Sequence, residues 1–350
     1  MNTPTLGDLL AFAHAKGASD LHLSAQKPVM LRIDGELSVL DMPVMTDAQI
    51  RAMLSSIMSK VDFEQWQNKL EHDFVISTKS SGRFRVNAFF QAQGAAAVFR
   101  LIADQVPRLT TLIDDEFVRQ SLIEITKLRS GLVLVTGATG SGKSTTLASL
   151  IDHINQSQKS HILTIEDPIE FEHRCQLSLI NQRQVGSSTM GFGQALRSAL
   201  REDPDVILVG ELRDLETIRL ALTAAETGHL VLATLHTVSA AKSIDRIVDV
   251  FDGHEKQLIR TLLADSLAAV IAQRLLPAVG GGRVAAFEIL KNTPAVANLI
   301  RENKLSQLPS IIQMGASQGM ISLDQHLSKL IHQAKITSQT ANAHADHLRF

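Results

Sequence analysis

A glycine-rich run at residues 137–145, GATGSGKST, holds the residues best suited to chemistry. It follows the apolar segment 131–136 and precedes a helical stretch, which is the setting of a phosphate-binding loop. The glycines let backbone N–H groups turn toward phosphate oxygens, and Lys143 would neutralise the β- and γ-phosphates. We therefore expect a nucleoside triphosphate to bind here, with Ser144 as a Mg²⁺ ligand. The expected binding residues are Gly137, Ala138, Thr139, Gly140, Ser141, Gly142, Lys143, Ser144 and Thr145.

A dinucleotide-binding turn is the main alternative for this run. The glycines here are spaced G-x-x-G-x-G and are followed at once by Lys143, whereas the dinucleotide fingerprint is G-x-G-x-x-G. The spacing therefore favours a phosphate-binding loop over a dinucleotide site, and also over a glycine-rich turn with a purely structural role.

Acidic residues follow two of the apolar runs downstream. Glu166, Asp167 and Glu170 come where the second strand is expected to emerge beside the loop. A carboxylate at the carboxyl end of a neighbouring strand can polarise water or hold a magnesium shell. A solvated acidic loop is the commoner explanation for such a string by itself, but Glu211 ends the third run and strengthens the case. Whether Glu211 serves water or magnesium stays open.

Two histidines, His229 and His236, bracket the fourth apolar run. In a strand, residues seven apart occupy opposite ends and opposite faces, so the two side chains would not share one ion. With no cysteine or third ligand nearby, a zinc site is not expected. Each histidine alone is more often a hydrogen-bonded structural residue, although His236 lies at the strand's carboxyl end and could report the γ-phosphate to a neighbouring element.

Arginines gather in the first hundred residues. Arg83 and Arg85 share one face of an expected strand, and Arg100 lies on the next. One explanation is that these arginines only form a charged, solvent-facing edge of a sheet, and it accounts for them as well as a functional role does. The functional alternative is an arginine clamp on a nucleotide bound elsewhere, because guanidinium stabilises charge on a transferring phosphoryl group.

The elements that must carry these residues fall into two patterns. The first hundred residues predict an α+β unit. A helix begins the unit, short strands turn at Asp34-Gly35, and a capping box at Thr46 and Gln49 starts a second helix. Two more strands, at 83–90 and 95–102, complete it. We expect a domain at 1–103 and a linker at 104–113, within a proline-containing segment that begins at Ala103.

From about residue 114 the pattern changes to apolar runs that alternate with helical stretches. The runs lie at 131–136, 161–166, 205–211 and 229–236. Near-continuous apolar strands of this kind are typical of a parallel sheet covered on both faces, so an α/β class is expected. The core domain is expected at 114–275. After Asp252 the chain looks mostly helical, and 276–350 is expected to be a mostly helical C-terminal region.

Composition limits the function classes. The chain has 350 residues, 45% of them hydrophobic, and a formal charge of −2, which gives no general basic surface for nucleic acid. A single cysteine, Cys175, excludes an internal disulfide and fits a reducing compartment. No apolar stretch approaches the ~18 residues that a membrane span needs. We expect a cytoplasmic protein that binds no nucleic acid and does not insert into a membrane.

Longer strings of the sequence resemble a known family. The loop, the Glu166–Glu170 segment, the stretch around Glu211 and the histidine-bracketed run look, in that order, like the Walker A, Asp box, atypical Walker B and His box motifs of secretion ATPases. Strings near both ends make the chain similar to the retraction ATPases of type IV pili within that superfamily. The strings are GATGSGKST, TIEDPIEF, residues 191–237, SAAKSIDRIVDVF, SDLHLS, RFRVNAFFQ and NLIRENKLSQL.

The resemblance implies a homohexameric ring in which a PAS-like N-terminal domain sits over the RecA-like core of a neighbour, with ATP between them. Carried over by motif position, Glu170 would be the catalytic base and Glu211 the Walker B carboxylate, and His229 and His236 would form the His box. Arg85 and Arg100 would reach ATP, with Arg83 as a second choice.

The implied work is pilus retraction in twitching motility. It would act through a platform protein of the inner membrane, at whose base the ring would dock, and an extension ATPase would oppose it. A paralogous retraction ATPase is a further expected partner.

Two departures from the family pattern leave alternatives open. Ala297 stands in AVANLI where the family commonly has an arginine, and residues 181–189 read NQRQVGSST, with less charge than usual. A regulatory or accessory pilus ATPase subunit, working with an active paralogue, is one alternative. An extension or type II secretion ATPase is another. ATPases of that kind resemble longer chains that carry a tetracysteine zinc insertion, and the single cysteine of this sequence argues against it. A DNA translocase would be stimulated by DNA, which is not expected.

Overall fold

The computed structural model describes residues 4–33, 35–78, 81–102, 105–346 and 348–349. The chain divides into two compact units, Met1–Gln105 and Val106–Phe350, and each is described by itself below. Residues 103 and 104, where the expected domain ends and the expected linker begins, lie outside the described residues, as does Asp34 of the expected turn.

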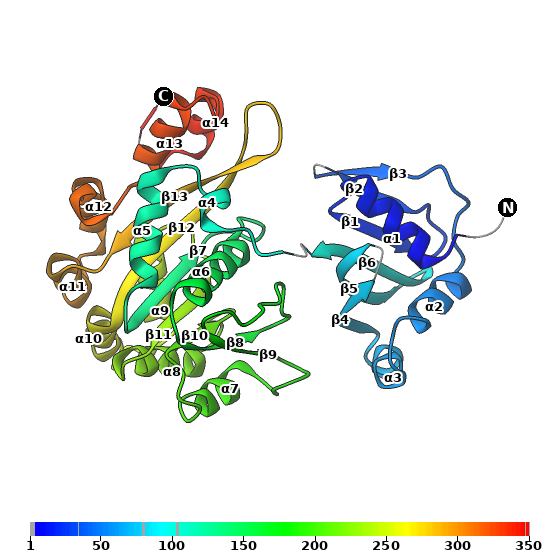
Figure 1. Ribbon diagram of the computed structural model, residues 1–350, viewed down its shortest axis with the longest axis horizontal. Helices are drawn as coiled ribbons and strands as arrows, with labels where there is room; N and C mark the ends of the chain where they lie inside the picture. Colours follow the sequence, from blue (N-terminus) through cyan, green and yellow to red (C-terminus); the bar gives the residue numbers. More distant parts are fainter. Residues whose placement is uncertain (1–3, 34, 79–80, 103–104, 347, 350) are drawn as a thin grey trace. The chain divides into compact units, whose positions relative to one another are not determined.

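The first unit is an antiparallel sheet with three helices (Figure 1). Its strands lie in the order β3-β2-β1-β6-β5-β4, and each neighbouring pair is antiparallel. The elements are α1 (Leu6–Ala15), β1 (Asp20–Ser24), β2 (Met30–Ile33), β3 (Glu36–Val39), α2 (Asp47–Ser55), α3 (Lys60–Lys69), β4 (Glu71–Thr78), β5 (Gly82–Gln91) and β6 (Gly94–Ile102).

A local sequence signal sets the start of α2. The capping box expected at Thr46 and Gln49 is present, and it satisfies free N–H groups at the start of α2. The sequence interpretation missed α3 and β4. Among the residues of α3 only Trp66 is buried, so the helix lacks a broad apolar stripe. Its Trp66 ring stacks on Phe90 with centroids 4.5 Å apart, a contact from another element that the local pattern does not show.

The second unit is a seven-stranded, mostly parallel sheet with helices on both faces, so the expected α/β class is confirmed (Figure 1). Its elements before the last two strands are α4 (Leu109–Leu112), α5 (Glu116–Thr126), β7 (Gly131–Thr136), α6 (Lys143–Ser157), β8 (His161–Glu166), β9 (Leu179–Gln184), α7 (Phe192–Ala199), β10 (Val206–Val209), α8 (Leu215–Glu226), β11 (Leu230–Leu235), α9 (Ala240–Asp249) and α10 (Lys256–Ser266). The remaining elements are β12 (Leu267–Pro277), β13 (Arg283–Lys291), α11 (Pro294–Arg301), η1 (Leu305–Gln307), α12 (Leu308–Met314), η2 (Ala316–Gln318), α13 (Leu323–His332) and α14 (Ser338–His344).

Strand β7 shows why the sheet is apolar on both faces. All six of its residues are buried. Leu132 and Leu134 belong to the core that α7 to α11 cover, whereas Val133 and Val135 belong to the core under α5 and α6. Alternate residues therefore serve opposite layers, as expected for a doubly covered strand.

The sheet order corrects one expectation about the site. The strand at 161–166 does not lie beside the loop strand, because the order is β13-β12-β7-β11-β10-β8-β9. Strands β10 and β11 separate β8 from β7, and β12 occupies the other side of β7. Crossover connections let strands that are consecutive in the chain stand apart in the sheet, so chain order alone misplaced β8.

The region after Asp252 also differs from the mostly helical expectation. It contains β12 and β13, which pair with each other antiparallel from Ala269 with Lys291 to Pro277 with Arg283. β12 also runs parallel to β7. The apolar stretch 267–272 fits a buried strand or a buried helix segment equally well by periodicity, and the sequence interpretation took it as helical. From Pro294 onward, in the part of the region that the structure describes, the helical expectation holds apart from a single bridge at Ile321.

Candidate nucleotide-binding site

The glycine-rich loop joins β7 to α6, as the sequence predicted. Gly137, Gly140 and Gly142 have φ angles of 149°, 79° and 88°, a region that side chains other than glycine rarely adopt. Gly142 is the cap residue of α6, and no side chain caps the helix there. The loop therefore leads directly to a helix N-terminus whose N–H groups and positive dipole end favour an anion.

The loop glycines also pack against β12. A Cβ at Gly137 would lie 2.3 Å from the Gln273 carbonyl oxygen, and a Cβ at Gly142 would lie 2.8 Å from Gln273 Nε2. A Cβ at Gly140, in contrast, would point into open space, with no atom within 4 Å. Close approach to the β12 backbone thus requires glycine at Gly137. At Gly142 the neighbouring atom belongs to a side chain, and at both Gly142 and Gly140 the positive φ favours glycine.

Lys143 lies inside the loop that it serves. Its ammonium donates to the carbonyl oxygens of Gly137 at 2.8 Å and Ala138 at 3.0 Å, and only 8% of the residue is exposed. Burial lowers the pKa of Lys143, while the carboxylates of Glu211 and Glu170 act in the opposite direction. The loop carbonyls, the Glu170 carboxylate and the Glu211 carboxylate, which come from three separate segments of the chain, therefore all act on this ammonium.

Two hydroxyls beside the loop are buried and lack a hydrogen-bond partner among the described residues. They are Thr136 Oγ1, at the end of β7, and Ser141 Oγ, inside the loop. An unsatisfied buried hydroxyl costs about 1–3 kcal/mol. The Ser141 donor, the lysine and the uncapped helix start together make a cradle that suits a ligand rich in acceptor oxygens, such as a polyphosphate.

Glu211 follows β10 and is held by two basic side chains. Arg213 Nε lies 2.7 Å from its Oε2, and His236 Nε2 lies 3.2 Å from its Oε1. Arg213 also reaches Asp167 at 3.3 Å. The hydrogen bond to the Glu211 carboxylate raises the pKa of Arg213. The structure thus brings the acidic segment after β8 together with Glu211 and His236.

Glu166 and Glu170 have different environments. Burial raises the pKa of Glu166, which accepts hydrogen bonds from Thr164 at 2.7 Å and from Gln182 at 3.2 Å. Glu170 lies in the irregular segment that follows β8 and is partly exposed. Glu166 is thus engaged by its neighbours, whereas the carboxylate of Glu170 acts on the pKa of Lys143.

The two histidines lie at opposite ends of β11. His236 follows the strand at the edge where the loop begins, because Leu235 pairs with Thr136. His229 precedes the strand, at the Gly131 end, and its Nδ1 lies 2.9 Å from the Ala224 carbonyl oxygen. Within this chain the fold brings His236 to the site and leaves His229 at the far edge of the sheet.

The arginines belong to the first unit. Arg85 and Arg100 stand opposite each other on β5 and β6. Arg100 Nε lies 2.7 Å from Asp20, and Arg85 Nη2 lies 3.5 Å from Asp73. Arg83 is on the same strand as Arg85, two residues earlier. All three arginines are thus positioned on one sheet, and their action on a nucleotide stays a prediction.

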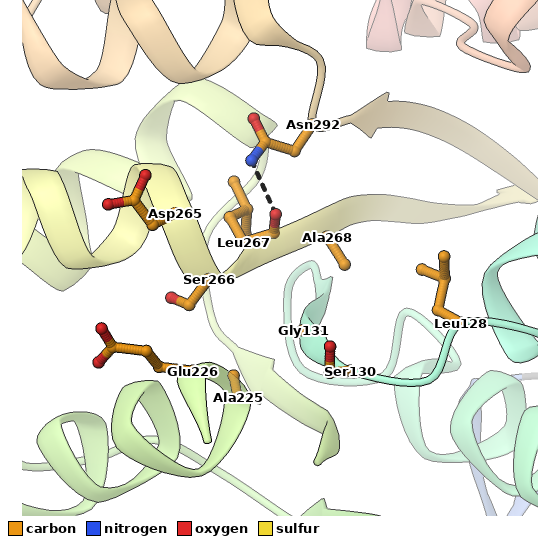
Figure 2. A pocket seen from close by; sticks show the side chains of 10 residues that line it. All are labelled: Leu128, Ser130, Gly131, Ala225, Glu226, Asp265, Ser266, Leu267, Ala268 and Asn292. Atoms are coloured by element: carbon orange, nitrogen blue, oxygen red, sulfur yellow. Dashed lines mark hydrogen bonds between the residues drawn. The ribbon is translucent and has the colours of Figure 1, made fainter. Parts of the chain in front are cut away.

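A pocket of about 310 Å³ lies away from this chemistry (Figure 2). It is found where β7 and β12 begin, whereas the loop lies where β7 ends. Figure 2 shows the carboxylates of Glu226 and Asp265 on one side and Leu128 on the other. Asp265 is paired with Arg301, so the pocket offers no convergent set of reactive groups. The remaining lining residues are Ser130, Gly131, Ala225, Ser266, Leu267, Ala268 and Asn292.

Neither a metal-binding cluster nor a membrane-spanning helix is found in the part of the chain that the structure describes. Among the described residues, no group of three or more histidine, cysteine, aspartate or glutamate side chains is arranged to hold a metal ion. Across the same residues, none of the helices combines the length and apolarity that crossing a bilayer demands.

Sequence reasoning missed two residues of the site. Arg213 lies in the same loop as Glu211, but its partners could be found only once the ends of β8, β10 and β11 were in place. Gln273 carried a weak signal, since it is a polar residue at the end of the apolar run 267–272. Because that run was interpreted as part of a helical region, Gln273 was not placed on a strand beside the loop.

Comparisons with known proteins cover nearly the whole chain. The family of type II/IV secretion system proteins matches residues 3–345. The type IV pilus retraction ATPase PilT of Pseudomonas aeruginosa is 52% identical over 338 residues, covering 97% of this chain and 97% of its own. A twitching motility protein of Neisseria gonorrhoeae is 51% identical over 318 residues, with 90% and 84% covered. A crystal structure of the pilus retraction motor PilT with bound ADP is similar at 44% identity and a TM-score of 0.88, with 99% and 98% covered.

Proposed function

Because this chain belongs to the family of type II/IV secretion system proteins, we propose that it is an ATP-hydrolysing motor that retracts type IV pili in twitching motility. Near-complete coverage of the chain by pilus retraction ATPases supports this assignment. The single observation that carries it from the structure is the loop of residues 137–145, in which the buried ammonium of Lys143 donates to two loop carbonyls and the carboxylates of Glu170 and Glu211 act on its pKa.

The loop would hold ATP by its phosphates. Backbone N–H groups of the loop and of the first turn of α6 would bind the phosphate oxygens, and the Ser141 hydroxyl has no competing partner among the described residues. Lys143 would leave the carbonyls of Gly137 and Ala138 and place its charge between the β- and γ-phosphates. One ammonium thus neutralises charge that grows on the leaving group as the reaction proceeds.

Mg²⁺ fits this site in a particular way. No cluster of three acidic or histidine ligands exists among the described residues, and Mg²⁺ is commonly held by substrate phosphates and water with only one or two protein oxygens. The Ser144 hydroxyl, at the start of α6, is the protein oxygen that the loop would supply. When bound, the ion neutralises the charge on the β- and γ-phosphates.

Hydrolysis would use the carboxylates at the ends of β8 and β10. Glu170 would accept a proton from the attacking water as the water oxygen bonds to the γ-phosphorus and the bond to the β,γ-bridging oxygen breaks. Glu211 would orient that water or the hydration shell of the magnesium ion. Arg213 and His236 hold the two oxygens of Glu211, and through this contact His236 would link the state of the γ-phosphate to the end of β11.

The assembly is proposed from the family as well. The chain would form a homohexamer in the cytoplasm, docked on a platform protein of the inner membrane, and a paralogous retraction ATPase is a further candidate partner. Arg85 and Arg100 would complete the ATP site of a neighbouring subunit in this ring. Although they pair with Asp73 and Asp20, both arginine side chains keep exposed surface, which the proposed contact with ATP requires.

One alternative has an observation behind it. Ala297 is buried in the apolar core that α11 helps to form, so the family's arginine is replaced here by a packing residue. This change favours a second candidate, an accessory subunit that works with an active paralogue. An extension or secretion ATPase is the other alternative, and it differs in the direction of the pilus phenotype.

Two measurements test the proposal. Purified protein should hydrolyse ATP in a Mg²⁺-dependent way. Lys143→Ala should reduce turnover by at least about 100-fold, because it removes the positive charge that would neutralise the phosphates. Lys159→Ala, an exposed lysine just beyond α6, is the matched control and should retain activity. Robust turnover by the chain alone would rule out the accessory subunit. Turnover that Lys143→Ala leaves unchanged would contradict the motor itself.

Deletion of the coding sequence should then decide direction. Surplus surface pili with lost twitching would support retraction, and missing pili would indicate extension. The wild-type chain should restore twitching in the deletion strain, whereas the Lys143→Ala chain should not.

A further inference from the structure

Gln273 is a buried amide in the strand that flanks the phosphate-binding loop. It lies on β12, directly after Ala272, which pairs with Thr136 at the end of β7. Only 4% of the residue is exposed. Burying an amide among apolar strands is costly unless its polar atoms are bonded, so the partners of this side chain indicate why it is there.

Both ends of the amide bind the loop and the helix that follows it. Nε2 donates to the carbonyl oxygen of Ser141 at 2.8 Å, and Oε1 accepts from the Thr146 hydroxyl at 2.7 Å. Both hydrogen bonds are buried. One side chain thus connects the buried end of the loop, at Ser141, to the first turn of α6.

The bond to Ser141 fixes the direction of a loop peptide. In a planar trans peptide the carbonyl and the next N–H point to opposite sides. Holding the Ser141 carbonyl toward Gln273 therefore turns the Gly142 N–H away from β12. That N–H belongs to the set that must face an anion at the start of α6.

The backbone of β12 adds a steric constraint to this bond. The loop approaches it so closely that a Cβ at Gly137 would meet the Gln273 carbonyl oxygen at 2.3 Å. A Cβ at Gly142 would meet the side-chain amide at 2.8 Å. The loop is therefore held on one side by the main chain and the side chain of a single residue.

We propose that Gln273 is a positioning residue that holds the phosphate-binding loop in its anion-binding form before the nucleotide arrives. The inference rests on the proposed function, because it assumes that the loop binds a nucleotide. It adds a specific source of preorganisation: ordering the loop in advance removes an entropy cost that binding would otherwise carry.

The test uses the full chain and ADP with Mg²⁺ as the probe. Gln273→Leu keeps a similar volume and removes both hydrogen bonds, so we expect ADP affinity and the KM for ATP each to weaken about tenfold. We expect kcat at saturating ATP to change by less than about threefold, because the loss affects bound substrate and transition state alike. Gln318→Leu, at an exposed position, is the matched control and should leave both constants unchanged.

Two further variants separate positioning from packing. Gln273→Glu keeps an acceptor for Thr146 but sets a carboxylate against the Ser141 carbonyl, so it should weaken ADP binding at least as much as Gln273→Leu. Thr146→Val removes only the second bond and should weaken binding by less than the leucine variant. These comparisons stay informative even if one variant folds poorly.

The outcomes are distinct. If Gln273→Leu and Gln273→Glu lower the melting temperature without nucleotide yet bind ADP as tightly as the wild type, Gln273 is only a core amide and the inference is wrong. If the wild-type chain itself does not bind ADP, the proposed function fails, whatever Gln273 does. Selective loss of nucleotide affinity with near-normal kcat supports the positioning role.

Discussion

Single residues around Glu211 show how the site handles charge. The two oxygens of this carboxylate have different partners, Arg213 at 2.7 Å and His236 at 3.2 Å. Arg213 also contacts Asp167, so it connects the acidic segment after β8 to the end of β10. A charge-assisted pair of this kind is directional, and it orients the carboxylate in addition to neutralising it.

The first prediction concerns this orientation. Arg213→Gln should lower kcat for ATP hydrolysis about tenfold with little change in ADP affinity, because Glu211 remains present but is no longer held. Arg197→Gln is the control, since Arg197 is an exposed arginine paired with Glu216 on the surface. Steady-state kinetics and ADP titration of both variants check the expectation. An unchanged kcat in Arg213→Gln would mean that the pair has no part in turnover.

At the scale of elements, the helix α13 is anchored to β13 by a histidine. His326 is buried, and its Nδ1 accepts the Phe287 backbone N–H at 2.8 Å. Burial lowers the pKa of His326 to about 4, while Asp115 raises it and Lys329 lowers it to smaller extents. The histidine must therefore stay neutral for this contact to persist.

The sign of the resulting pH dependence follows from linkage. An unfolded histidine takes up its proton near pH 6.5, so between about pH 6.5 and 4 the unfolded state binds more protons. Stability is fully present above that window and falls as the pH decreases through it. At about pH 5 the loss attributable to His326 is on the order of 2 kcal/mol.

The second prediction uses this window. His326→Gln keeps an acceptor for Phe287 but cannot take up a proton. Between about pH 7.5 and 5, its urea midpoint should therefore fall less than that of the wild type. His332→Gln, an exposed position on the same helix, is the control and should follow the wild type. Equal acid sensitivity of His326→Gln and the wild type would remove His326 as the cause.

At the scale of the whole molecule, the proposed ring makes a prediction about mixed subunits. Lys143→Ala and Arg85→Ala should each be inactive alone. If Arg85 acts on the ATP of a neighbour, mixing them restores part of the activity, since some boundaries then combine an intact loop with an intact arginine. ATPase measurements on mixtures at constant total concentration check this. The unmixed preparations are the controls, and no recovery at any ratio would place the arginine in its own subunit's site.

The glycine-rich loop between β7 and α6 could be predicted from the sequence because the signals that specify it are local. Glycine at positive φ, a lysine and a following helix all depend on neighbours within nine residues, 137–145. The α/β class was predictable for a similar reason, since an apolar run such as 131–136 reports a strand buried on both faces. Each of these features is set by short-range backbone and solvation preferences.

The partners of the loop were decided only by the tertiary structure. Chain order suggested that β8 stands beside β7, but the neighbours of β7 in the sheet are β11 and β12. Gln273 lies 132 residues beyond Ser141 in the chain, and Arg213 meets Asp167 across 46 residues. Such contacts depend on which strands pair and on the side of the sheet that each crossover takes, a choice made by the packing of the whole domain. The sequence by itself therefore determined that a glycine-rich loop with a lysine follows a buried strand, and the tertiary structure determined which residues hold that loop in place.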